Sequence, residues 1–153
     1  MPVVDITELP PAGALLGLDL GEKTIGVAVS DAMRFIASPL ELIRKSKFTA
    51  EAERLFQLMD ARKVAGVVIG LPINMDGTEG PRAQSSRAFG RNLMRLRDVP
   101  VAFWDERMSS MAVNRMLIGE ADVTRARRAE LVDKAAAACS LQGALDRLRN
   151  LPT

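Results

Sequence analysis

Two apolar segments, residues 14–20 (ALLGLDL) and 24–30 (TIGVAVS), are separated only by Gly21-Glu22-Lys23. Strand-forming runs joined by a short glycine-containing turn are typical of a β-hairpin. One carboxylate, Asp19, interrupts the first run. Taken alone, Asp19 fits three roles: a hydrogen-bonded polar residue of the core, part of a phosphate-binding turn, or a metal ligand.

The next strong signal is residues 64–70 (VAGVVIG), a continuous apolar run expected of a central parallel strand covered on both faces. Three strands followed by alternating helix and strand predict an α/β fold with a mixed sheet flanked by helices. The other expected elements are a strand near 35–43, a helix with Thr49 as its N-cap, a helix opening at Pro81, a strand at 99–104, a short helix from Ser109 or Ser110 to about 118, and a helix over about 124–149.

The length of 153 residues suits one domain, and we expect a short extension at 1–13 followed by a single domain at 14–150. No apolar run is long enough to cross a membrane, and the N-terminus lacks the pattern of a secretory signal. The single cysteine, Cys139, excludes an internal disulfide and suits a reducing cytosol, so we expect a cytoplasmic protein.

Histidine is absent from the chain. Its absence excludes Ser–His and Cys–His nucleophilic chemistry and the usual zinc hydrolase sites. An enzyme of this composition must work through carboxylates, lysines or hydroxyls. The net charge is only +2, so any affinity for nucleic acid must come from locally clustered arginines.

Acidic residues stand at the ends of three expected elements: Asp19 on the first strand, Asp105 and Glu106 after the last strand, and Asp133 early in the final helix. If they converge, their repulsion calls for divalent cations, and two ions would support phosphodiester cleavage. Each residue alone also fits a solvated surface position. The choice between Asp105 and Glu106 stays open, because adjacent strand residues point to opposite faces.

Basic residues cluster at two places. Arg87, Arg91 and Arg95 are spaced to share one helix face, and Arg125, Arg127 and Arg128 precede Asp133. They fit either contacts to substrate phosphates or a solvated basic surface. Lys23 in the hairpin turn and the loop GLPINMDGTEGP, which contains Asn74, are further candidates for anion binding.

The segments GLDLGEKTIGVAVSD, VVIGLPINMDGTEGPRA, DERMSSMAVNRML and VDKAAAACSLQGALD resemble, in this order, the YqgF/RuvX family, described as pre-16S rRNA nucleases and Holliday junction resolvase homologues. The resemblance implies an RNase H-like fold, with a five-stranded mixed sheet, and a metal-dependent nuclease using Mg²⁺ or Mn²⁺. It places the catalytic and metal-binding carboxylates at Asp19, Glu106 and Asp133, with Asp105 as a further candidate. The implied or suggested substrate-binding residues are Lys23, Asn74, Arg107, Arg87, Arg91, Arg125 and Arg128.

We therefore expect a nuclease that processes the 5′ end of pre-16S rRNA. The alternatives are a structure-selective nuclease that resolves Holliday junctions in DNA, and a non-catalytic nucleic-acid-binding assembly factor. The sequence does not separate RNA from branched DNA as the substrate. It also leaves the oligomeric state open, with a homodimer among the alternatives.

Overall fold

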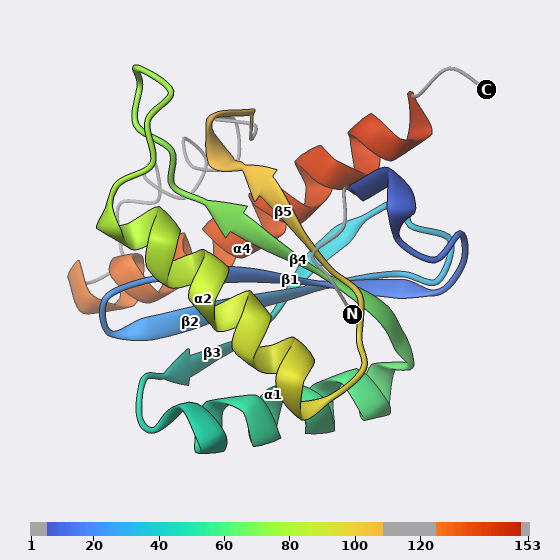
Figure 1. Cartoon of the computed structure of the whole chain (residues 1–153), viewed down its shortest axis with the longest axis horizontal. Helices are drawn as coiled ribbons and strands as arrows, with labels where there is room; N and C mark the ends of the chain where they lie inside the picture. The colour runs from blue at the N-terminus through green and yellow to red at the C-terminus, as the bar shows by residue number, and fades with distance from the viewer. Residues whose placement is uncertain (1–5, 109–124, 151–153) are drawn as a thin grey trace.

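The computed structural model describes residues 6–108 and 125–150, with the side chains of 125–134 excepted. Its centre is a five-stranded sheet of order β3-β2-β1-β4-β5 (Figure 1). The strands are β1 (Ala14–Leu20), β2 (Thr24–Ser30), β3 (Ala37–Arg44), β4 (Val64–Leu71) and β5 (Val101–Asp105). β1, β2 and β3 pair antiparallel in sequence order, whereas β4 is parallel to both β1 and β5. The predicted mixed sheet is confirmed.

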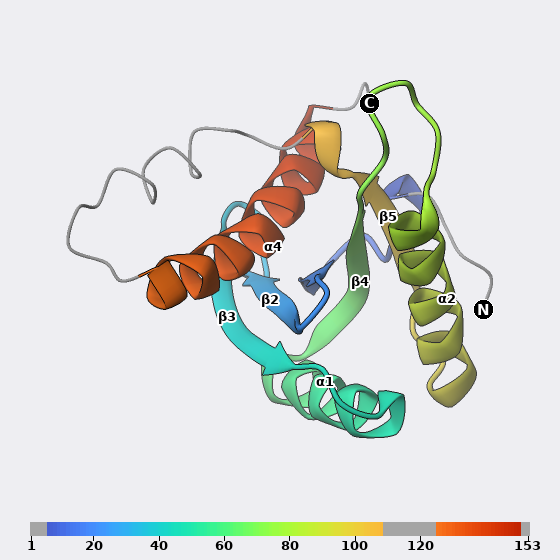
Figure 2. The ribbon, with the colours of Figure 1, turned by 90° about the vertical axis from the view of Figure 1, so that its left-hand side faces the viewer.

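Helices cover both faces of the sheet, as the two views show (Figures 1 and 2). α1 (Phe48–Arg62) and α2 (Pro81–Leu96) lie on one face, and α4 (Arg125–Arg149) lies on the other. Two short 3₁₀ turns, η1 (Ile6–Glu8) and η2 (Glu106–Met108), complete the described elements. None of the helices in this part of the chain is long and apolar enough to span a bilayer.

Alternation along β1 decides which side chains face α4. Leu16 and Leu18 belong to the core under α1 and α2, whereas Leu15 belongs to the core under α4. Successive strand side chains point to opposite faces, so Gly17 and Asp19 also lie on the α4 side. A Cβ on Gly17 would stand 2.8 Å from the Cβ of Leu141, which shows how closely α4 packs there. Asp19 therefore lies beneath a tightly packed helix.

Two predicted boundaries are wrong for identifiable reasons. α1 begins at Phe48, with Lys47 as N-cap and no side-chain cap, so Thr49 does not cap it. Instead the buried carboxylate of Glu51 accepts a hydrogen bond from the backbone N–H of Ser46 at 2.9 Å. β3 begins at Ala37 because Asp31 Oδ1 binds the two preceding backbone N–H groups in a turn.

The remaining boundaries lie within two residues of those expected. β5 begins at Val101, two residues later than expected, and α4 begins at Arg125. The segment before β1 contributes to the core, because Ile6 and Leu9 are buried in the cluster beneath α4. The short helix expected from Ser109 or Ser110 falls outside the described residues.

Candidate active site

Asp19 and Glu106 meet on the α4 side of the sheet, although their strands are not neighbours. β4 lies between β1 and β5, and its Gly70 pairs with Trp104, two residues before Glu106. A Cβ at residue 70 would stand only 2.7 Å from Glu106 Oε1 and 3.1 Å from Ser140 Oγ. Glu106 thus lies directly over Gly70 and its side chain hydrogen-bonds that of Asp19. The absence of a side chain on Gly70 makes this approach sterically feasible.

The surroundings of Glu106, including Asp19, raise the pKa of its carboxyl group. Burial, the hydrogen bond to Asp19 and the negative charge of Asp19 together raise the pKa of Glu106 to about 8. The charge of Asp105 raises this pKa further, and the nearby Arg82 guanidinium opposes the rise. A second negative charge this close to Asp19 is unfavourable unless a cation compensates it. Carboxylate oxygens are the ligands that Mg²⁺ and Mn²⁺ prefer, so this pair fits a divalent ion.

The third predicted carboxylate is not tested. Asp133 lies in α4, four residues before Ala137 and eight before Leu141, the two residues of α4 that contact Gly17. Its side chain belongs to the group that is not described. Among the described residues, no group of three or more Asp, Glu, His or Cys side chains could hold a metal ion. Asp133 as a ligand therefore stays a prediction.

Asp105, the alternative to Glu106, is engaged elsewhere. Its carboxylate receives Arg107 Nε at 3.1 and 3.0 Å, Arg107 Nη2 at 2.7 Å, and the backbone N–H of Arg107. The side-chain bond to Arg107 holds the pKa of Asp105 below its usual range. Arg107 also donates to the carbonyl of Asn74 at 3.3 Å. Of the two adjacent acids, Glu106 is the one beside Asp19, and Asp105 positions Arg107.

A hollow of about 480 Å³ opens beside Glu106. Asn74, Arg82 and Arg107 line it, so two of the predicted substrate-binding residues share this hollow with Glu106. The loop that carries Asn74 is stabilised by a hydrogen bond within the loop: the side-chain amide of Asn74 donates to Thr78 Oγ1 at 3.0 Å. The hollow combines the Glu106 carboxyl group with two arginines, a set of side chains that would suit a divalent ion and a phosphate.

Arg82 is a functional candidate that the sequence reasoning did not select. It occupies the first turn of α2, directly after Pro81, and its Nη2 donates to the carbonyl of Leu20 at 3.4 Å. Its charge acts on Glu106. The available signal was its place at a helix start directly after the glycine-rich loop, where anions bind favourably.

Among the described side chains, those of Arg87, Arg91 and Lys23 do not line this hollow. Arg87 forms an ion pair with Glu79 at 2.6 Å and lies 5.1 Å from the ring centre of Phe103. Arg91 is exposed on α2, and Lys23 is exposed in the hairpin turn. Arg125 and Arg128 lie at the start of α4, where side chains are not described. A substrate role for these residues stays a prediction.

The fold places the chain among RNase H-like proteins. Thermus thermophilus RuvC is similar with a TM-score of 0.52 and 16% identity, over 89% of this chain and 95% of that one. The yeast mitochondrial Holliday junction resolvase Ydc2 is similar with a TM-score of 0.51 and 13% identity, over 94% of this chain and 84% of that one. At these identities the likeness concerns the fold alone.

The sequence comparison defines the family. Residues 13–147 match the family described as "RuvX: Holliday junction resolvase". A protein of Phenylobacterium zucineum is 71% identical, over 99% of this chain and 100% of its own length. One of Caulobacter vibrioides is 62% identical over the same shares. Both are named "Putative pre-16S rRNA nuclease". The chain belongs to the RuvX family.

Proposed function

We propose that this protein is a divalent-metal-dependent nuclease that processes the 5′ end of pre-16S rRNA in the cytoplasm. The observation that carries the proposal is the Asp19–Glu106 carboxyl pair, held over Gly70 and beside Arg82. The names of the relatives support pre-16S rRNA as the substrate, because these relatives match nearly the whole chain.

Asp19, Glu106 and Asp133 would hold Mg²⁺ or Mn²⁺, as a pair of ions. Such ions activate a water and stabilise the leaving oxygen of a phosphodiester. Glu106 would lose its proton on binding the cation, and the positive charge of the cation would offset the repulsion between the two carboxylates. Arg82 and Arg107 provide positive charge in the hollow beside Glu106, where they would bind the phosphate and hold it against the carboxylates. Asp105 keeps Arg107 in place through its paired hydrogen bonds.

The test is a cleavage assay on two substrates. Purified protein is incubated with Mg²⁺ or Mn²⁺ and either a 5′-extended 16S rRNA fragment or a four-way DNA junction. We expect removal of the RNA extension, no cleavage with EDTA, and loss of cleavage in Glu106→Gln. Asp105→Asn is the matched control, because it removes the adjacent carboxylate but leaves the pair with Asp19.

Each alternative has its own outcome. Preferred cleavage of the junction would support the resolvase hypothesis and contradict the RNA assignment. Binding of RNA without metal-dependent turnover would support a non-catalytic assembly factor. Sedimentation of the same preparation distinguishes a monomer from the homodimer that the sequence leaves open.

A further inference from the structure

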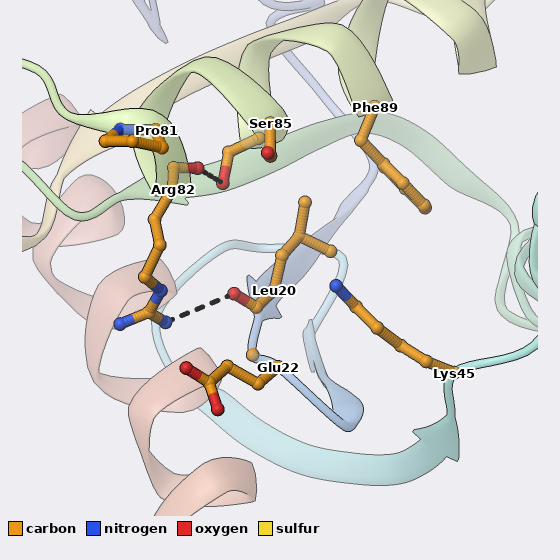
Figure 3. Close-up of a pocket in the computed structure, with 9 residues that line it drawn as sticks. Leu20, Glu22, Lys45, Pro81, Arg82, Ser85 and Phe89 are labelled. Carbon is orange, nitrogen blue, oxygen red and sulfur yellow. Dashed lines mark hydrogen bonds between the residues drawn. The ribbon is translucent and has the colours of Figure 1, made fainter.

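A second hollow, of about 250 Å³, shares Arg82 with the first. It lies between the hairpin that joins β1 to β2, the residue after β3, and the first turns of α2 (Figure 3). None of the residues predicted to bind substrate lines it. Pro81 and Arg82 line both hollows, so the two spaces are adjacent at the start of α2.

Two cationic side chains face this space. Arg82 and Lys45 extend toward Leu20 from opposite sides (Figure 3). The backbone N–H of Lys45 donates to the carbonyl of Lys23 at 2.9 Å, which fixes its position against the hairpin. Neither Lys45 nor Arg82 forms a salt bridge with another described residue.

Part of the remaining wall is apolar, and the rest carries Glu22, Ser85 and Ser86. Leu20 and Phe89 line the hollow beside the two cations. Phe89 is held by an edge contact with Phe48, at 5.2 Å between ring centres and an angle of 84°. Apolar and aromatic surface next to positive charge is what proteins use to bind unpaired nucleotides, with the base on the apolar surface and the phosphate on the cations.

We propose that this hollow binds one unpaired nucleotide of the strand being cleaved, with its phosphate between Arg82 and Lys45 and its base against Leu20 and Phe89. The inference rests on the proposed nuclease function and adds a substrate class to it. A paired base is stacked inside its helix and does not reach such a wall, so the site selects a single-stranded segment next to the cleaved bond.

One acidic residue at the edge of the hollow allows a test of whether a phosphate binds there. Glu22 lines the same hollow, and in Figure 3 its carboxylate lies on the Arg82 side. A phosphate bound here is repelled by Glu22 and attracted by Lys45. Neutralising these two residues should therefore change RNA affinity in opposite directions.

The experiment measures binding without cleavage. Fluorescence anisotropy of a short unstructured RNA oligonucleotide, in EDTA and at several salt concentrations, is recorded for the wild type, Lys45→Gln, Glu22→Gln and Lys63→Gln. Lys63 is the matched control: it loses the same charge, but the 15-residue α1 separates it from Lys45, a length of roughly 22 Å.

We expect Lys45→Gln to weaken binding roughly fivefold and to lower the salt slope by about 0.7, the loss of one phosphate contact. Glu22→Gln should tighten binding, and Lys63→Gln should leave it unchanged. With a blunt RNA duplex of the same sequence, the Lys45 and Glu22 effects should disappear. Equal weakening by Lys45→Gln and Lys63→Gln, or an unchanged Lys45→Gln, would overturn the proposal.

Failure of the nuclease function is distinguishable from failure of this site. If the wild type cleaves neither substrate but the anisotropy pattern holds, the nucleotide site stands and the nuclease assignment is wrong. If the wild type cleaves pre-rRNA but Lys45→Gln binds single-stranded RNA as tightly as Lys63→Gln, only the nucleotide site is wrong.

Discussion

Glu106, in the turn that follows β5, reaches across β4, and its carboxyl group hydrogen-bonds that of Asp19 on β1. Gly70 makes the crossing feasible, since any side chain there would collide with the Glu106 carboxyl group. This contact joins β1 to the end of β5, and no sequence pattern within either segment predicts it. It also provides the clearest tests of the site.

Replacing Asp19 by Asn should abolish metal-dependent cleavage while leaving folding and RNA binding largely intact. Asn keeps the size and hydrogen-bonding capacity of Asp but loses the charge that a divalent cation needs. We expect at least about a 100-fold loss of cleavage rate, since even groups that only support a metal ligand cost 10- to 100-fold when removed. Circular dichroism and RNA anisotropy provide the controls. Full activity in Asp19→Asn would remove Asp19 from the site.

The metal-free protein should lose stability as the pH rises from about 5 to 8. The folded state raises the pKa of Glu106 from 4.5 to about 8, so the folded protein binds this proton more tightly than the unfolded chain. The stabilising contribution is fully present below pH 4.5 and is lost as the pH rises through 8. Glu106→Gln does not titrate, so its melting temperature in EDTA should rise relative to the wild type across this range. Parallel curves of melting temperature against pH for the two proteins would contradict the raised pKa of Glu106.

Asp105→Asn and Glu106→Gln should differ sharply, although the residues are adjacent. Asp105 holds Arg107 through hydrogen bonds near the surface, and an exposed ion pair contributes at most about 1 kcal/mol. We expect Asp105→Asn to reduce cleavage by less than about tenfold, because it loosens one arginine but leaves the acid pair in place. Glu106→Gln should remove nearly all cleavage. The ratio of the cleavage rates of Asp105→Asn and Glu106→Gln shows which of the two acids the reaction requires.

Gly70→Ala should destabilise the protein and lower its affinity for Mn²⁺. The new methyl group would stand 2.7 Å from Glu106 Oε1, so the carboxyl group must move away from Asp19. Overpacking of this kind costs about 1–3 kcal/mol. Gly17→Ala is the matched control on the same face, where the methyl group meets Leu141 at 2.8 Å instead of a carboxylate.

Calorimetric titration of Mn²⁺ separates the two glycine variants. Gly17→Ala should lose stability but keep its Mn²⁺ affinity at a temperature where it is folded. Equal Mn²⁺ affinity in folded Gly70→Ala and wild type would show that the position of Glu106 over Gly70 is unimportant for the metal.

Much of the fold could be predicted because it follows from local patterns. The hairpin at 14–30, the buried strand β4 and the helix opening at Pro81 are encoded by apolar periodicity and by turn residues within each segment. The expected start of α1 was wrong because Glu51, and not Thr49, provides the side-chain contact to the backbone there. Such contacts depend on how the chain turns and are not visible in periodicity.

The sequence by itself limited the chemistry available: without histidine, any catalysis must use carboxylates, lysines or hydroxyls, and Asp19 is a carboxylate inside a buried strand. Only the tertiary structure showed that Glu106, and not Asp105, lies against Asp19, and only it placed Arg82 near Glu106. The reason is physical. A strand pattern encodes which face each residue of that strand occupies, whereas contacts across an intervening strand depend on sheet order, register and the missing side chain of Gly70.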